Sequence, residues 1–186
     1  MKNILLIGNS GGLGRALQAA WHIRGDEVMG FSRQTDGFDI TDEDTVERIL
    51  GTVKTRFDIV FIATGGLETE CSQPEKSLSE LRKRAFQEQF LLNAIGPALV
   101  LKHVPKLLHK DRTTIVATLS ARVGSIGDNH LGGWYSYRAS KAALNQIVHS
   151  AAIELSRKRP KSICIALHPG TVRTALTQKY VGKHPA

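Results

Sequence analysis

The sequence predicts an α/β fold, in which helices cover both faces of a doubly wound parallel sheet. Short runs rich in Ile, Val, Leu and Phe alternate with longer segments of helical periodicity, and this alternation is typical of parallel strands joined by right-handed helical crossovers. With 186 residues, of which 41% are hydrophobic, the chain can bury one substantial core. We therefore expect a single three-layer α/β/α domain over residues 1–186.

Five apolar runs are expected to form the sheet, because each is short and rich in β-branched or aromatic residues. They are residues 3–7, 27–31, 58–63, 113–119 and 162–167. The segments between them show the 3.6-residue spacing of helices: residues 12–24, 41–55, 77–109 and 136–157. The last helix carries an apolar stripe made of Leu144, Ile147, Val148, Ala151 and Leu155.

Two helices carry further local signals. Thr41 followed by Asp44 resembles a capped, acidic helix start. Pro97 follows Gly96 inside the third helical segment, where proline removes a backbone donor and crowds the preceding turn. We expect that segment to be either two helices or one kinked helix.

Composition excludes several classes of protein. No run approaches the roughly 18 to 20 apolar residues of a membrane span, and the apolar start at residues 3–7 is too short for a signal peptide. Of the two cysteines, Cys71 and Cys164, the second lies in an apolar run and is expected to be a buried thiol, which favours a reducing cytoplasm. No cluster has metal-ligand spacing, so no metal is expected.

The net charge of +8 and the pI of 9.7 also raise the question of nucleic-acid binding. The basic residues are scattered, and the short groupings at 82–84 and 157–161 fall on expected helix surfaces or ends, where cations are ordinary. We expect no nucleic-acid partner. A positive surface would instead attract a phosphate-bearing cofactor.

A glycine-rich turn follows the first strand directly, with the sequence G-N-S-G-G-L-G at residues 8–14. Glycines let a backbone turn sharply and approach a pyrophosphate, and the free amides of the following helix start supply donors. The spacing G-x-x-x-G-x-G differs from G-x-G-x-x-G because Ser10 stands at the second glycine position. The turn predicts a dinucleotide site, the alternative being a glycine-rich turn that binds nothing.

The end of the second strand indicates which dinucleotide is preferred. NAD-binding proteins place a carboxylate on the adenosine ribose at this point, whereas this chain has Ser32 and Arg33. A guanidinium binds a 2′-phosphate that a carboxylate would repel. We expect NADP(H) to be preferred over NAD(H), unless Arg33 is an ordinary surface residue.

Tyr137 and Lys141 are four residues apart and so share one face of the last helix. A phenol has an ordinary pKa of about 10, and a nearby ammonium lowers it by favouring the phenolate. A tyrosine tuned in this way can serve as a general acid or base. Alone, the pair is also typical of an ordinary helix surface, so its meaning depends on the other motifs.

Together these features resemble the short-chain dehydrogenase/reductase family over residues 2–174, and residues 120–141 resemble its carbonyl-reductase branch, which includes C-factor signalling proteins. Gly8, Gly12 and Gly14 match the family's glycine pattern, and Tyr137 with Lys141 matches its active-site pair. The resemblance implies a Rossmann-like fold and hydride transfer between a nicotinamide and a carbonyl or alcohol carbon, with Tyr137 moving the hydroxyl proton.

The resemblance also implies roles for other residues. Asp39 and Ile40 match the adenine contact, Asn93 matches the helix asparagine that holds a relay water, and residues 169–174 match the loop beside the nicotinamide. Lys141 is expected to bind the nicotinamide ribose and to lower the pKa of Tyr137. The complete set of expected cofactor contacts is Gly8, Asn9, Ser10, Gly12, Leu13, Gly14, Ser32, Arg33, Asp39, Ile40, Ala63, Thr64, Gly65, Asn93, Tyr137, Lys141, Pro169, Gly170, Val172 and Thr174.

The chain departs from the family's pattern at three points. The family's catalytic serine stands three residues before a glycine, and here that position is Ala121; Ser120 is the expected substitute, with Ser125 as the alternative. The family's Asn-Ala-Gly is replaced by Ala63, Thr64 and Gly65. The chain ends at Ala186, dozens of residues before a typical member, so we expect a minimal or incomplete member that lacks the last strand.

The functional expectation is an NADP(H)-dependent oxidoreductase with Asn93, Ser120, Tyr137 and Lys141 as its catalytic residues. An alternative hypothesis, suggested by Ala121 and by the change at Ala63 and Thr64, is an NADP(H)-binding sensor or signalling protein with little turnover. Trp134 is either an aromatic wall of the pocket or a core anchor. The expected partners are a small carbonyl or alcohol substrate and, as the resemblance implies, further copies in a homodimer or homotetramer.

Overall fold

A computed structural model describes residues 1–69, 73–170, 172, 174 and 178–179. Cys71 therefore lies outside the described residues. Five strands form one parallel sheet in the order β2-β1-β3-β4-β5. Their bounds are β1 Asn3–Ile7, β2 Glu27–Phe31, β3 Ile59–Ile62, β4 Thr114–Leu119 and β5 Ser162–Leu167. The predicted doubly wound parallel sheet is confirmed, and each strand boundary is within one residue of the expected one.

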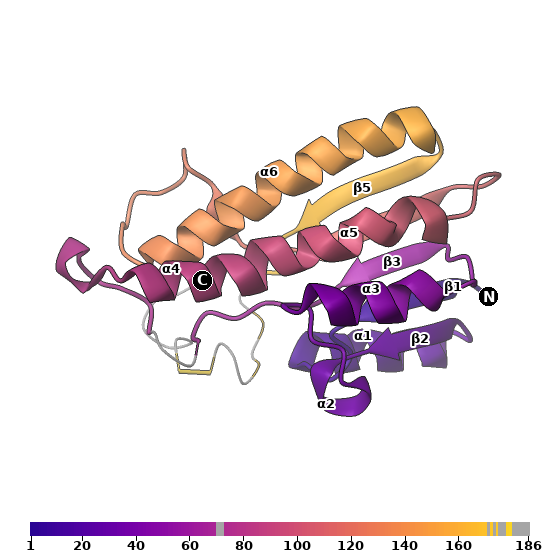
Figure 1. The fold of residues 1–186 in the computed structure, drawn as a ribbon, viewed down its shortest axis with the longest axis horizontal. Coiled ribbons are helices and arrows are strands. Elements are labelled where there is room, and N and C mark those ends of the chain that lie inside the picture. Colours follow the sequence, from indigo (N-terminus) through magenta and orange to yellow (C-terminus); the bar gives the residue numbers. More distant parts are fainter. Residues whose placement is uncertain (70–72, 171, 173, 175–177, 180–186) are drawn as a thin grey trace.

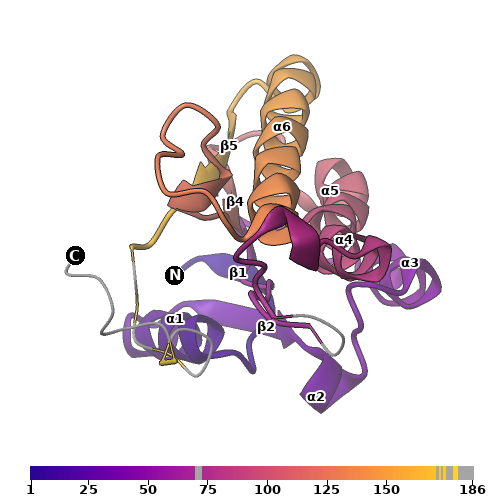
Figure 2. The same cartoon turned by 90° about the vertical axis from the view of Figure 1, so that its left-hand side faces the viewer.

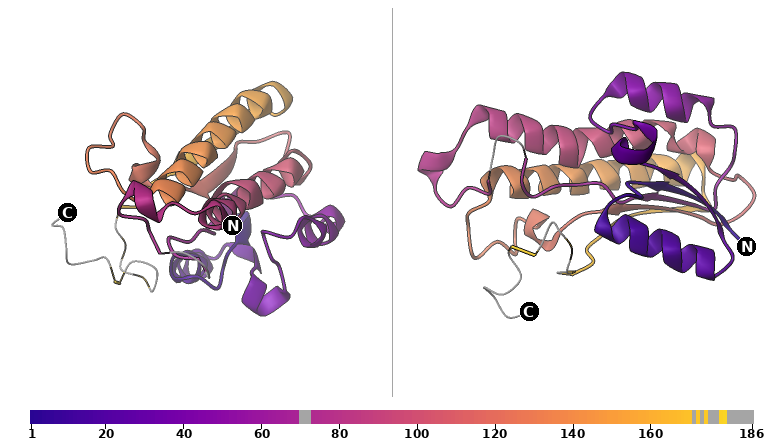
Figure 3. Two further views of the ribbon diagram at one scale, coloured as in Figure 1. Left: turned by 60° about the vertical axis from the view of Figure 1, so that its left-hand side comes forward. Right: turned by 90° about the horizontal axis from the view of Figure 1, so that it is seen from below.

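The sheet is covered on both faces (Figures 1 and 2). One face packs against α3 (Glu43–Thr52), α5 (Gly96–Leu107) and α6 (Tyr135–Lys158), and the other packs against α1 (Gly12–Ile23) (Figure 3, right). Alternate residues of β1 enter the two cores: Leu5 and Ile7 join the larger cluster, whereas Ile4 and Leu6 pack with Trp21 of α1. Helices on both sides of a sheet explain why the strands are apolar on both faces.

The order in which strands are added to the sheet reverses at β1, because β2 pairs on one side of β1 and β3 pairs on the other. The loops after these strands leave from the same edge, where Gly8 N–H donates to Phe31 O (2.7 Å) and Ala63 N–H donates to Ile7 O (2.8 Å). Open parallel sheets bind ligands at such a switch point, outside the carboxyl ends of the strands. The topology therefore places the glycine loop and residues 63–66 beside each other.

The helix boundaries differ from expectation where a cap decides them. α3 begins at Glu43 rather than Thr41, because the Asp42 side chain is the N-cap and accepts from Asp44 N–H (3.1 Å). Thr41 instead donates its amide and hydroxyl protons to Asp39 Oδ1. A short helix, α2 (Arg33–Asp36), was not expected; Ser32 caps its start and Gly37, with φ of +63°, ends it.

The segment predicted as residues 77–109 is divided into several parts: a 3-10 turn at Leu78–Glu80, α4 (Lys83–Phe90), a π turn at Leu91–Ile95, and α5. Gly96 N–H donates to Leu91 O, five residues back, so one extra residue is accommodated just before Pro97. The expected irregularity at Gly96 and Pro97 is confirmed, and its form is a π turn, which is frequent at functional sites.

Within the described ranges, no helix is both long and apolar enough to span a membrane. In the same part of the chain, no group of His, Cys, Asp and Glu is arranged to hold a metal ion. Cys164 is a partly buried free thiol that contacts Val148 O, and burial raises its pKa to about 11.

Candidate active site

The glycine loop has the close packing that a phosphate site requires. Gly8 has φ of +90°, a conformation that favours glycine. A Cβ on Gly14 would lie 2.1 Å from Gly8 O, so only glycine lets the first turn of α1 approach the loop this closely. A Cβ on Gly12, the first residue of α1, would meet the Thr174 side chain at 3.0 Å.

The surroundings of this loop fit a nucleotide. The N-terminus of α1 has no side-chain cap and no acidic residue in its first turn, which leaves its positive dipole end available to an anion. Among the described residues, the buried Asn9 Oδ1 and Thr64 Oγ1 find no hydrogen-bond partner. Buried polar atoms normally have a hydrogen-bond partner, and a polar ligand at this loop would provide one for each of these two atoms. Leu13 and Ser10 line the same turn, and Ser10 O accepts from Arg15 Nε (2.7 Å).

The residues expected around the adenosine lie along the adjoining edge. Ser32 is engaged as the cap of α2, and its Oγ accepts from Thr35 N–H (3.2 Å). Arg33, the first residue of α2, is exposed and makes no side-chain hydrogen bond to another described residue. Asp39 is partly buried, and Ile40 packs against Gly96, where a Cβ would lie 2.8 Å from Ile40 O.

The loop after β3 is held by the π turn. The buried Asn93 side chain makes a paired contact with Gly66: Oδ1 accepts from Gly66 N–H (3.0 Å) and Nδ2 donates to Gly66 O (2.9 Å). Gln89, also buried, accepts from Asn93 Nδ2 (2.5 Å) and donates to Leu67 O (2.9 Å). A helix asparagine thus fixes a loop that lacks the expected asparagine of its own.

Lys141 extends from α6 toward this loop. A Cβ on Gly65 would lie 3.1 Å from Lys141 Nζ and 3.0 Å from Asn93 Oδ1, so Lys141 and Asn93 approach the same glycine. Lys141 Nζ donates to Leu119 O (3.1 Å) at the end of β4. The side chain is only 3% exposed. Burial lowers the Lys141 pKa to about 8, because the charged form is desolvated.

Tyr137 lies beside this lysine, but the expected effect on its pKa is absent. Burial raises the pKa of Tyr137 to about 12. Lys141 Nζ lies 5.8 Å from the centre of the Tyr137 ring, a cation–π geometry rather than a contact with the phenolic oxygen. The prediction of a lowered pKa is therefore wrong for this structure, since desolvation dominates. Trp134 packs edge-on to Tyr137, with ring centres 6.3 Å apart.

The hydroxyl that should assist Tyr137 is differently placed from expectation. Ser120 Oγ donates its proton to Asn145 Oδ1 (2.6 Å), and this proton is the only one that a serine hydroxyl carries. Ser125 Oγ is exposed and accepts from Asp128 N–H (3.3 Å). Ser120, Ala121 and Asn145 together line a hollow of about 420 Å³ that also contacts His168 at the end of β5.

The segment after β5 returns to the glycine loop, since Thr174 contacts Gly12. Pro169 and Gly170 are exposed, and Gly170 has φ of +74°. Val172 is partly buried. Thr171 and Arg173, which belong to the same predicted loop, lie outside the described residues.

Sequence reasoning missed three contributors to the site: Gln89, the Leu119 carbonyl and Asn145. No local signal marks a backbone carbonyl as an ammonium acceptor. Gln89 was detectable in principle, because it stands four residues before Asn93 on the same helix face.

The fold and this edge of the sheet define the class of protein: a doubly wound α/β protein with a glycine loop, fit for a nucleotide, at the same sheet edge as a partly buried tyrosine and a buried lysine. Comparison with known proteins then identifies the family. Residues 2–184 match the short chain dehydrogenase family model. The chain belongs to the short-chain dehydrogenase family, and it is a dehydrogenase/reductase acting on alcohol or carbonyl groups. The family uses a nicotinamide cofactor.

Three similar proteins illustrate the range of relatives. The chain is 28% identical to 1-hydroxy-2-glutathionyl-2-methyl-3-butene dehydrogenase of Rhodococcus sp. (strain AD45), over 99% of this chain and 84% of that protein. It is 41% identical to C-signal of Myxococcus xanthus over 46% of this chain and 50% of that protein. A putative short-chain dehydrogenase/reductase from Burkholderia multivorans with bound NADP is similar in structure, with a TM-score of 0.77, 27% identity, and coverage of 94% of this chain and 81% of that chain.

Proposed function

We propose that the protein is an NADP(H)-dependent carbonyl reductase or alcohol dehydrogenase in which Tyr137 transfers the hydroxyl proton. One observation carries this proposal. The buried Lys141 ammonium lies against Gly65 and beside the Tyr137 ring, at the carboxyl edge of the sheet where the glycine loop also lies. An uncompensated buried cation is costly, so its presence at this edge favours a chemical role.

The chemistry divides between cofactor and protein. When bound, the nicotinamide would supply or accept the hydride. With a pKa of about 12, the Tyr137 phenol keeps its proton at neutral pH and is suited to donate it to a carbonyl oxygen as negative charge develops. Lys141, whose pKa is about 8, remains largely protonated at pH 7 and stabilises the phenolate that donation leaves. Asn93 and Gln89 hold residues 66–67 at the lysine.

The preference for NADP(H) is part of the proposal. Arg33 is exposed at the first turn of α2, beside the carboxyl end of β2, and makes no side-chain hydrogen bond within the described chain. It is therefore available for a 2′-phosphate. The Burkholderia multivorans neighbour has NADP bound, which supports the same preference.

Ser120 is the expected polarising hydroxyl, and it can donate its proton to a substrate only after its hydrogen bond to Asn145 Oδ1 breaks. Of the two hydroxyls of Ser120 and Tyr137, that of Tyr137 remains as the proton donor until then. This observation favours a second candidate function, an NADP(H)-binding signalling protein with slow turnover; similarity to C-signal points the same way. Tight NADPH binding without turnover on any carbonyl would select this second function.

The proposed chemistry is tested by NADPH oxidation against a panel of aldehydes and ketones. We expect Tyr137→Phe to lower kcat by about 100-fold or more, because positioned proton transfer contributes on that scale. The dissociation constant for NADPH, measured by fluorescence, should stay within about twofold, since the hydroxyl is lost without change of shape. Equal turnover in the variant and the wild type would refute the role of Tyr137.

The cofactor preference is tested by comparing Arg33→Ala with Arg48→Ala, an exposed arginine on α3. Arg33→Ala should weaken NADPH binding about tenfold while leaving NADH binding nearly unchanged, because only the 2′-phosphate contact is lost. Arg48→Ala should leave the ratio of the two affinities unchanged. A homodimer or homotetramer and a cytoplasmic location stay predictions.

A further inference from the structure

Glu75 is a buried carboxylate that the proposed chemistry does not use. It follows Pro74 in the connection between β3 and α4, and it is only 3% exposed. A buried carboxylate is costly unless hydrogen bonds or opposite charge compensate it. Within the described residues, its Oε1 has no hydrogen-bond partner, and the hydrogen bonds of its Oε2 and backbone oxygen lead to the start of α6.

The N-terminus of α6 lacks its own cap. Its N-cap residue, Trp134, has φ of +53° and offers no side-chain cap, and the first turn has no acidic residue. The first amides of a helix have no partner within the helix. The start of α6 therefore depends on groups from elsewhere in the chain.

Glu75, 61 residues before Ser136 in the sequence, supplies hydrogen-bond acceptors for the start of α6. Its Oε2 accepts from Ser136 N–H (3.2 Å), and its backbone oxygen accepts from Trp134 N–H (2.5 Å). The carboxylate also faces the positive end of the helix dipole. The fit is close, since a Cβ on Gly133 would lie 3.3 Å from Glu75 O.

The residues held in this way adjoin the proposed proton donor. Ser136 precedes Tyr137 directly, and the Trp134 ring packs edge-on to the Tyr137 ring. A shift at the start of α6 would move both rings, and a misplacement of about 1 Å can cost about 100-fold in rate. Lys141 lies one turn further along, where Leu119 O holds it independently.

We propose that Glu75 is a positioning residue, which sets the place of Tyr137 by accepting hydrogen bonds from the first turn of α6. This inference rests on the proposed role of Tyr137. The connection between β3 and α4 would then help to position the proton donor, a role that the sequence motifs do not indicate.

The experiment compares Glu75→Ala, Glu75→Gln and Glu75→Asp in the full chain. Glu75→Ala removes the carboxylate that accepts from Ser136 N–H and keeps the backbone oxygen that accepts from Trp134 N–H. It should lower kcat about 10- to 100-fold, with the NADPH dissociation constant within about twofold of wild type. Glu75→Gln keeps an acceptor oxygen at the same reach and should stay within about threefold of the wild-type kcat. Glu75→Asp has a side chain one methylene shorter, so its carboxylate should no longer reach Ser136 N–H. Its kcat should be at least about fivefold lower than that of Glu75→Gln.

Asp42→Ala is the matched control. Asp42 also caps a helix with its carboxylate, but that helix, α3, carries none of the proposed site residues. Asp42→Ala should lower the melting temperature without lowering kcat. A loss in Glu75→Ala no larger than in Asp42→Ala would show that Glu75 is only structural. If Glu75→Ala does not fold, the comparison of Glu75→Asp with Glu75→Gln decides the question.

Hydrogen exchange provides a readout that needs no substrate. The Ser136 amide should exchange faster in Glu75→Ala and return to wild-type protection in Glu75→Gln. Unchanged protection in Glu75→Ala would overturn the positioning role. If the wild type turns over no carbonyl, the proposed function fails, whereas the exchange measurement still tests the contact itself.

Discussion

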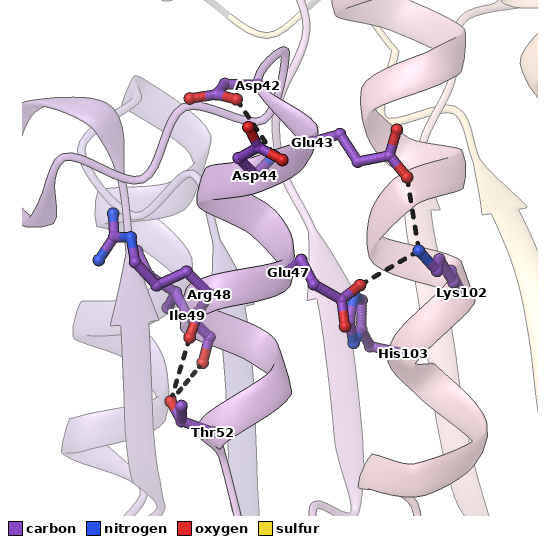
Figure 4. A network of polar contacts seen from close by, with 9 residues as sticks. All are labelled: Asp42, Glu43, Asp44, Glu47, Arg48, Ile49, Thr52, Lys102 and His103. Carbon is purple, nitrogen blue, oxygen red and sulfur yellow. Dashed lines mark hydrogen bonds and ion pairs between the residues drawn. The ribbon is translucent and has the colours of Figure 1, made fainter.

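Two lysines of this chain, Lys102 on α5 and Lys141 on α6, have opposite electrostatic surroundings. Lys102 lies on the surface between α3 and α5, where its Nζ is 3.1 Å from Glu47 Oε2 and 3.4 Å from Glu43 Oε1 (Figure 4). These carboxylates raise the Lys102 pKa. Lys141 is buried, its Nζ donates to the backbone oxygen of Leu119, and its pKa falls to about 8.

The difference shows where this fold tolerates an unfavourable charge. The α3–α5 contact joins two helices that carry no proposed catalytic group, and there the cation is matched by carboxylates. The buried cation, Lys141, has no carboxylate partner among the described residues, and it lies at the carboxyl edge of the sheet, beside Tyr137. Perturbed ionisable groups concentrate at functional sites, and this contrast supports the proposal that residues of α6 carry out the chemistry.

The sharpest test of the comparison exchanges each lysine for methionine. Lys141→Met should lower kcat for carbonyl reduction by about 100-fold, because the positive charge beside Tyr137 is lost. Lys102→Met should leave kcat within about twofold, since its partners are solvent-exposed. Equal effects of the two substitutions on steady-state NADPH oxidation would remove the distinction between the two regions.

A second test uses pH. The pKa of Lys141 is about 8 in the folded chain, against an ordinary 10.5 that applies to the unfolded chain. Between these values the unfolded state binds more protons at this site, so the free energy of unfolding should rise with pH. Relative to Lys141→Met, the wild type should gain about 2 kcal/mol between pH 7 and pH 10.

Urea denaturation at intervals over that range measures the gain. The range ends at pH 10 because the raised pKa of Tyr137 acts in the opposite direction above its ordinary value of 10.0. A constant difference between wild type and variant would contradict a depressed Lys141 pKa.

The smallest effect is expected in the α3–α5 network. Glu47→Gln removes a carboxylate that Lys102 and His103 share, while Glu43 still pairs with Lys102. The melting temperature should move by no more than about 2 °C because the Glu47 carboxylate is exposed. Desolvation already lowers the His103 pKa, and Glu47 opposes this, so the variant should lower it further. An NMR titration of His103 measures that direction, and an unchanged His103 pKa would show that the Glu47 charge has no effect on it.

Most of the fold could be predicted from the sequence. The strands are apolar throughout because both faces of the sheet are buried, and the helices show a 3.6-residue spacing because each buries one side. α2 was missed because four residues carry no periodicity, although Ser32 and Gly37 at its ends are typical cap residues. The start of α3 was assigned to Thr41 because the motif there also fits Asp42, and only the geometry shows which side chain reaches the Asp44 amide.

The site was predictable as a set of residues and not as an electrostatic environment. The four-residue spacing of Tyr137 and Lys141 places them on one helix face, but it does not tell how deeply either side chain is buried. Desolvation therefore reversed the expected direction for the Tyr137 pKa. Glu75 was not predictable either, because its contact joins segments 61 residues apart.

The π turn at Leu91–Ile95 has a consequence for how this chain can change in length. A π turn is equivalent to one residue inserted into an α-helix, and each residue of an α-helix turns the face by about 100°. Deleting one residue there would rotate the following helix, so that the buried side of α5, which includes Val100, Val104 and Leu107, would no longer face the sheet. Asn93 and the buried face of α5 can both be correctly oriented only with the present number of residues between them. An insertion or deletion between Asn93 and α5 should therefore be poorly tolerated.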